Sequence, residues 1–197
     1  MTPHRVLRRE DPEAARLLAA GWVVAGESWG ARFAAGPEHL ARLAGDGAPA
    51  RGRRLATIGW CALQAGITER ALEMTADYAR TREQFGKQIG SFQAVRQRLA
   101  DAYIDVEAVR LTVLEAAWRE SEGLDAVAEI ATAKFWAAEA GHRVAHTTVH
   151  VHGGVGIDTD HPTHRYFVAA KRTEFALGGA TAHLRALGAT LAGRNPA

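Results

Sequence analysis

Cysteine is almost absent from the sequence, with Cys61 the single example among 197 residues. One cysteine can form no disulfide within the chain and cannot build a cysteine-based metal cluster. Proline is also scarce, with 6 residues, which argues against extensive disorder. The low cysteine content suits a reducing compartment, and we expect the protein to be cytoplasmic.

Long apolar runs and a strong excess of one charge are lacking as well. No stretch approaches the roughly 20 apolar residues of a membrane-spanning helix, and residues 1–20 contain no apolar signal core. The formal net charge is only +2, and basic and acidic residues are mixed along the chain. We therefore expect no membrane span, no export signal and no nucleic-acid partner.

The composition that remains is that of a globular protein, with 47% hydrophobic and 23% charged residues. The length suits one core with a short appendage. A glycine- and proline-rich stretch at residues 45–49 divides the chain. We expect residues 1–46 to form an N-terminal arm or the remnant of a lost segment, with a helix starting at Asp11 and a short strand at residues 22–25. Residues 47–197 then form the main domain.

Helical periodicity dominates the main domain. Apolar residues recur at spacings of three and four along residues 51–82, 91–123 and 125–153. A fourth helix is expected from residue 162 toward 178–179, and a shorter one at 181–192. The strand signal beyond residue 50 is negligible. The sequence therefore predicts an all-α fold, an antiparallel four-helix bundle with a short N-terminal arm.

Residues suited to helix ends flank these segments. Ser91 and Asp125 are expected to cap the second and third helices, Gly123 to end the second, and Pro162 to begin the fourth. The positions expected to face the core are Leu55, Ile58, Ala62, Ala65, Leu72, Ala76 and Ala79 in the first helix, Phe92, Val95, Leu99, Ala102, Val106, Val109, Val113 and Ala116 in the second, and Val127, Ile130, Ala137, Val144 and Val151 in the third. Small residues of the third helix, including Gly141, let a neighbouring helix approach closely.

The segment between the first two helices combines a cation, an aromatic ring and a flexible residue. It reads Arg82-Glu83-Gln84-Phe85-Gly86-Lys87, and Phe92-Gln93 follows. A guanidinium can hold two phosphate oxygens, an aromatic ring can stack on a flat heterocycle, and glycine permits a sharp turn. These properties suit an adenine dinucleotide. The alternative is an ordinary helix end, with cations near the negative end of the dipole and Phe85 returned to the core.

A second candidate segment ends the third helix. It reads His150-Val151-His152-Gly153-Gly154-Val155-Gly156-Ile157. Glycines expose backbone amides and let a ligand approach the chain closely, so such a loop can hold an anion or a ring edge. A helix precedes the glycines where the dinucleotide fingerprint requires a strand, so this is not a Rossmann turn. The alternative is a glycine-rich connection between helices.

The two motifs, in this order within a helical bundle, resemble the carboxyl-terminal domain of the acyl-CoA dehydrogenase family over about residues 47–192. The resemblance implies FAD as the cofactor, with its ADP half contacted across a subunit interface. These contacts are implied for Arg82, Gln84, Phe85, Phe92, Gln93, His150, Val151, His152, Gly153 and Gly154. Family members often carry glutamine where this sequence has His150, and an imidazole can still make one hydrogen bond there.

The resemblance also implies a carboxylate base that this sequence lacks. In the family, a carboxylate removes a proton alpha to a thioester while a hydride from the beta carbon passes to the flavin. The base position matches Leu177, and the alternative base position on the first helix matches Arg53. Glu174 lies about one turn before Leu177, and we interpret it as a surface or helix-pairing residue. We therefore expect no catalytic residue in this chain.

A subunit of a heteromeric acyl-CoA dehydrogenase is the function that these features imply together. The chain resembles the small, base-lacking subunit of enzymes that act on CoA thioesters of steroid side chains. A larger partner would supply the base and most of the acyl-CoA site, in a heterotetramer with two copies of each subunit. This chain alone is then expected to be inactive.

Two other functions stay open at this point. The chain could be a structural or interaction bundle that has lost flavin binding. His142, His146 and His150 share one helix face, so a zinc site is a further alternative. No further ligand occurs at a matching spacing, and we expect no metal.

Overall fold

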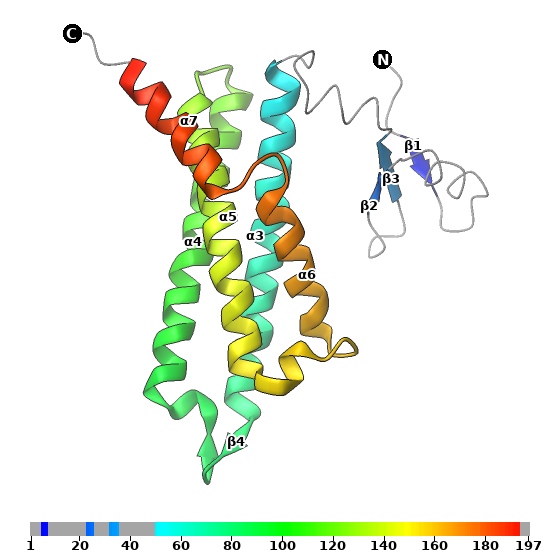
Figure 1. Ribbon diagram of the computed structural model, residues 1–197, viewed down its shortest axis with the longest axis vertical. Helices are drawn as coiled ribbons and strands as arrows, with labels where there is room; N and C mark the ends of the chain where they lie inside the picture. Colours follow the sequence, from blue (N-terminus) through cyan, green and yellow to red (C-terminus); the bar gives the residue numbers. More distant parts are fainter. Residues whose placement is uncertain (1–4, 8–22, 26–31, 36–49, 194–197) are drawn as a thin grey trace. The chain divides into compact units, whose positions relative to one another are not determined.

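The computed structural model describes residues 5–7, 23–25, 32–35 and 50–193 (Figure 1). Contacts divide the chain into two compact units, Met1–Arg53 and Arg54–Ala197. The helix expected to start at Asp11 lies outside the described residues, and the assignment of residues 1–46 as an arm stays a prediction.

The first unit contains a small antiparallel sheet. Its strands are β1 (Arg5–Leu7), β2 (Val23–Ala25) and β3 (Arg32–Ala35), in the order β1-β3-β2. The strand expected at 22–25 is confirmed as β2, whereas β1 and β3 were not predicted. Their three and four residues are too few for an alternating pattern to stand out.

The second unit is a bundle of helices, which confirms the predicted all-α class. Three long helices, α3, α4 and α5, lie side by side along the bundle, and the shorter α6 and α7 pack against α5 (Figure 1). No helix in the described part of the chain is long and apolar enough to cross a membrane. The helices are α3 (Ala50–Thr81), α4 (Gln93–Ser121), α5 (Val127–His152), α6 (Pro162–Phe175) and α7 (Ala180–Gly193).

The helix ends agree with the sequence in part. Gly123 follows α4 with a φ of 69°, and Pro162 begins α6, as predicted. The Asp125 carboxylate accepts the backbone N–H of Val127 at 3.1 Å, so it stabilises the start of α5. The predicted cap at Ser91 is wrong, because its hydroxyl donates to the Gln88 carbonyl at 2.7 Å and lies in a short 3-10 helix, η1 (Ile89–Ser91).

The predicted core faces of α4 and α5 are confirmed in most positions. Phe92, Val95 and Leu99 at the start of α4 are only half-buried, and Val127 is exposed. The predicted face of α3 is wrong in part, because Leu55 is exposed and Ala62 faces solvent. Polar side chains occupy much of the buried face instead. They are Thr57, Gln64, Thr68 and Thr75. Apolar periodicity cannot locate such a face, since its burial depends on hydrogen bonds that only the assembled bundle supplies.

Gln64 is the centre of this polar contact between α3, α5 and α6. Its Nε2 donates to the Ala170 carbonyl at 3.4 Å, and its Oε1 accepts the Thr173 hydroxyl. The side chain reaches α6 by passing Gly141 of α5, where a Cβ would lie 2.7 Å from Gln64 Cδ. The expected close approach at Gly141 is therefore confirmed, and the group that approaches is an amide side chain.

We expect Gly141→Ala to lower the free energy of unfolding by about 1–3 kcal/mol, because the added methyl overlaps a buried, hydrogen-bonded side chain that has no room to move. Chemical denaturation of the full chain measures the change. Gly59→Ala is the matched control, since Gly59 is exposed within α3 with no atom near its would-be Cβ. Equal stability of the two variants would contradict the prediction, and Gln64→Ala combined with Gly141→Ala should recover part of the loss.

Candidate functional site

A short hairpin presents the first predicted motif. Strands β4 (Glu83–Gln84) and β5 (Lys87–Gln88) pair antiparallel with Gln84 opposite Lys87, which leaves Phe85 and Gly86 as a two-residue turn. The expectation of no strand beyond residue 50 is thus wrong at this position. Both turn residues have positive φ, 54° for Phe85 and 74° for Gly86. This is the requirement of a type I′ turn, which favours asparagine followed by glycine.

Phe85 therefore stands in a strained conformation and packs against little. Its side chain is 92% exposed, and among the described residues its ring contact is with Phe92, with centroids 6.2 Å apart and 88° between the planes. Lys87 Nζ lies 4.5 Å from the centre of the Phe92 ring, which is a cation–π contact. This contact was not predicted from the sequence. The alternative in which Phe85 returns to the core is wrong.

Polar groups of the motif are also open to a ligand. Arg82, Gln84 and Gln93 are exposed. Within the described residues, Arg82 makes no ion pair, although its backbone N–H donates to the Tyr78 carbonyl at 2.8 Å and continues the turn of α3. A guanidinium free of ion pairs can hold phosphate oxygens, and an exposed ring three positions along the chain can stack on a heterocycle.

The second motif lies at the end of α5, and its residues divide into two groups. His150, Gly153 and Gly154 are exposed, and no atom lies within 4 Å of a Cβ added at either glycine. Val151 and His152 are buried, with exposures of 8% and 5%. Their side chains pack inward, so any contact they make with a ligand is through the backbone.

The bundle brings the two motifs to the same end. The β4–β5 hairpin follows α3, and the glycine turn η2 (Gly153–Ile157) follows α5, at the lower end in Figure 1. The rings of Tyr78 and His152 stack there, with centroids 4.3 Å apart and 22° between planes. Segments separated by about seventy positions thus lie at one end of the bundle, and both have exposed residues there. We call the residues Arg82, Gln84, Phe85, Phe92, Gln93, His150, Gly153 and Gly154 the hairpin face.

The expected base position lies at the other end of α6. Leu177 follows that helix with a φ of 56°, and Gly178 has a φ of 106°. His183 Nε2 donates to the Leu177 carbonyl at 2.9 Å, a contact that sequence reasoning missed. Since α6 has 14 residues, Leu177 lies about 21 Å from the start of α6, the end that adjoins the glycine turn. The base position and the hairpin face are therefore separate sites.

Neither alternative carboxylate position provides a base. Arg53 is exposed on α3. Glu174 pairs with Lys171 at 2.5 Å and with His142 Nδ1 at 3.3 Å, so it joins α6 to α5 and the helix-pairing interpretation is confirmed. Its backbone carbonyl accepts Nζ of the buried Lys134 at 3.0 Å, and burial lowers the pKa of this lysine.

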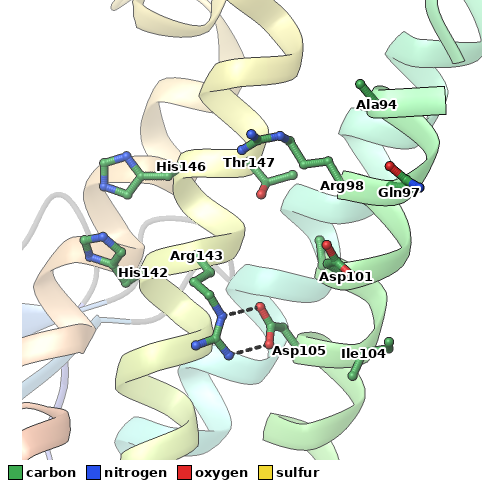
Figure 2. Close-up of a pocket in the computed structure, with 11 residues that line it drawn as sticks. Ala94, Gln97, Arg98, Asp101, Ile104, Asp105, His142, Arg143, His146 and Thr147 are labelled. Carbon is green, nitrogen blue, oxygen red and sulfur yellow. Dashed lines mark hydrogen bonds and ion pairs between the residues drawn. The ribbon is translucent and has the colours of Figure 1, made fainter. Parts of the chain in front are cut away.

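A groove of about 720 Å³ lies between the first half of α4 and the second half of α5 (Figure 2). Arg143 crosses it to Asp105 through two hydrogen bonds of 2.5 and 2.8 Å, whereas Arg98 extends alongside Thr147. None of the predicted cofactor contacts lines this groove. The rings of His142 and His146 lie at its edge, with centroids 4.4 Å apart and 36° between their planes. In the part of the chain that the structure describes, no three histidine, cysteine, aspartate or glutamate side chains are arranged to hold a metal.

Comparison with known families identifies the family of the helical domain. Residues 54–192 match the family model described as "Acyl-CoA dehydrogenase, C-terminal domain". The chain therefore belongs to the acyl-CoA dehydrogenase family, a family of oxidoreductases whose cofactor is FAD. The resemblance drawn from the two motifs is confirmed.

This chain matches part of the length of its relatives in sequence and in structure. Acyl-CoA dehydrogenase FadE27 of Mycobacterium tuberculosis is 65% identical over 146 residues, which are 70% of this chain and 39% of FadE27. The ChsE4–ChsE5 complex of Mycobacterium tuberculosis gives a TM-score of 0.73 at 53% identity, covering 90% of this chain and 50% of the matched chain. The Tcur3481–Tcur3483 steroid acyl-CoA dehydrogenase G363A variant gives 0.71 at 36% identity, covering 87% and 48%. The chain thus spans half or less of the length of these proteins.

We expect Phe85→Asn to leave the chain as stable as the wild type or to stabilise it by up to about 1 kcal/mol. Asparagine tolerates the left-handed conformation, and little packing is lost with a ring that is 92% exposed. Thermal and urea unfolding measure the change. Phe85→Ala is the control, because it removes the same ring without relieving the backbone strain. An asparagine variant no more stable than the alanine variant would show that the turn is unstrained.

Proposed function

We propose that this chain is a subunit of a heteromeric FAD-dependent acyl-CoA dehydrogenase, in which it completes the ADP side of an FAD site and its partner supplies the catalytic base. The observation that carries the proposal is the hairpin face at one end of the bundle, combined with an alkyl residue, Leu177, at the base position. The hairpin face supplies groups that can bind the cofactor. Leu177 cannot transfer a proton, so this chain does not supply the base.

The hairpin face fits the ADP half of FAD in its chemistry. Arg82 is exposed and free of ion pairs among the described residues, so its guanidinium is available to the charge of a pyrophosphate. Phe85 offers a ring face to an adenine or ribose, and the open glycine turn lets the backbone approach. A strained, exposed aromatic residue is costly in a free chain, which favours a role in binding.

FAD, when bound, accepts a hydride from the beta carbon of the acyl thioester. The residues of this chain contribute binding and orientation. Arg82 binds the negatively charged pyrophosphate, and Phe85 and Phe92 exclude water from it. The 153–154 turn binds the other side of the dinucleotide through its backbone. Leu177 moves no proton, so the carboxylate that removes the alpha proton belongs to the partner.

A larger acyl-CoA dehydrogenase-like subunit is the proposed partner, in a heterotetramer with two of each chain. The names of the ChsE4–ChsE5 and Tcur3481–Tcur3483 proteins describe two different subunits, and the latter is named a steroid enzyme. We therefore propose a steroid side-chain CoA thioester as the substrate, bound mainly on the partner. The lone and buried Cys61 suits a reducing compartment, and we place the complex in the cytoplasm.

Replacing Arg82 and Phe85 together by alanine should remove most FAD from the co-expressed complex, by about tenfold or more, because a charge contact and a stacking contact are both lost. The flavin absorbance per complex measures retention. The matched control is Arg172→Ala with Phe175→Ala, an exposed pair with the same spacing on α6. Unchanged FAD content in the Arg82 and Phe85 variant would favour a structural bundle that no longer serves flavin binding.

Leu177→Ala should leave the turnover of the complex within about twofold of the wild type, because an alkyl side chain transfers no proton at this position. Steady-state desaturation of an acyl-CoA by the co-expressed complex measures it. Substitution of the partner's base by its amide isostere is the positive control and should abolish turnover. Activity in this chain purified alone, without any partner, would contradict the division of roles.

A further inference from the structure

His152 occupies an unusual position for a residue of a ligand-facing motif. Its ring is only 5% exposed, and Nδ1 lies 2.8 Å from the Thr148 carbonyl. A carbonyl oxygen only accepts hydrogen bonds, so Nδ1 must carry the proton and Nε2 is unprotonated in the neutral ring. The family resemblance implied a cofactor contact for the stretch that contains His152, whereas the fold places its side chain inside the bundle.

The ring contacts both segments that lead to the hairpin face. On one side it stacks on Tyr78 of α3 at 4.3 Å, and the carbonyl of Tyr78 accepts the backbone N–H of Arg82. The second segment is the glycine turn, which begins at Gly153 directly after His152. One turn further into the bundle, the Thr75 hydroxyl donates to Thr148 Oγ1 at 3.2 Å. These two contacts join the end of α3 to the end of α5.

A third element meets the same ring. His161 lies 5.4 Å from His152 by ring centroids, and its Nδ1 accepts the backbone N–H of Thr163 at the start of α6. His152 thus lies where the ends of α3 and α5 meet the start of α6. Moving its ring would change the spacing between the hairpin and the glycine turn.

From this geometry we infer that His152 is a positioning residue: as a neutral ring it holds the Arg82–Phe85 hairpin and the Gly153–Gly154 turn in register for one dinucleotide. The inference rests on the proposed function, because it assigns a role within that same FAD site. His152 acts through Tyr78 and the adjacent backbone, and its side chain touches no cofactor. The consequence is that FAD binding by the complex depends on the protonation state of a buried group.

The surroundings of the ring oppose a positive charge. The groups that face it are the Thr148 carbonyl on α5, the Tyr78 phenol from α3 and the His161 imidazole before α6. No carboxylate of the described residues forms an ion pair with it. Burial lowers the pKa of His152, the hydrogen bond to Thr148 opposes this, and His161 lowers it further.

The direction of the pH effect follows from this lowered pKa. The folded chain binds the proton less readily than the unfolded chain, so the contact is fully stable above the ordinary histidine pKa of about 6.5. Its contribution is lost progressively as the pH falls below that value toward the folded-state pKa. FAD binding should weaken at lower pH, as the pH falls through the lowered pKa of His152 in the folded chain, because a protonated ring no longer holds the two segments together.

The test measures FAD dissociation constants of the co-expressed complex by flavin fluorescence, from about pH 7.5 down to the lowest pH at which the complex stays folded. The wild type should bind FAD more weakly at the low end of this range, by about threefold or more. His152→Phe keeps the stacked ring without a titrating group and should bind FAD with an almost constant affinity. His146→Phe is the matched control, since His146 is also on α5 with a pKa lowered mainly by burial but contacts Phe167 of α6. It should retain the wild-type profile.

His152→Ala supplies a second measurement that does not depend on FAD. Hydrogen exchange of the peptide containing residues 82–92 should accelerate in this variant, although the substitution is on another helix, and His152→Phe should restore protection. A wild-type pH profile in His152→Phe, or unchanged exchange in His152→Ala, would overturn the inference. A wild-type complex without FAD at any pH would instead refute the proposed function, and the exchange result would then decide the coupling between the two segments alone.

Discussion

Gln64 reaches from α3 past Gly141 of α5 to the backbone and hydroxyl of α6, and much of the bundle follows from this contact. A buried amide is tolerated only where its donors and acceptors are paired. The pairing fixes both the separation of the helices and their register along the bundle axis. A purely apolar contact would allow more sliding, because hydrophobic burial is non-directional.

That register determines what meets at each end. Toward the hairpin, it aligns Thr75 with Thr148 and Tyr78 with His152, so that segments far apart in sequence come to the same end of the bundle. Toward the other end, Nζ of the buried Lys134 donates to the Glu174 carbonyl in the last turn of α6. A cation at a helix C-terminus is favourable, since the last carbonyls lack partners within the helix. The same contact between α3, α5 and α6 therefore determines the packing at both ends of the bundle.

Strain is present at both ends, with different consequences. Phe85 and Leu177 are the two described residues other than glycine with positive φ. Such conformations persist only where the surroundings enforce them. The hairpin enforces the first, and it leaves the ring exposed. His183 and the α6 terminus enforce the second, and the side chain there has no titrating group.

The sequence by itself determined the helical class, most helix boundaries, the two motifs and the absence of a base at position 177, because each depends on local periodicity or on the identity of single residues. Only the tertiary structure decided which face of α3 is buried, that Phe85 lies in a strained hairpin turn, and that the side chain of His152 points inward. These features depend on hydrogen bonds and ring contacts between helices, such as Gln64 with Thr173 and Tyr78 with His152. Partners distant in sequence leave no periodic signal, and their effect exists only once the bundle has brought them together.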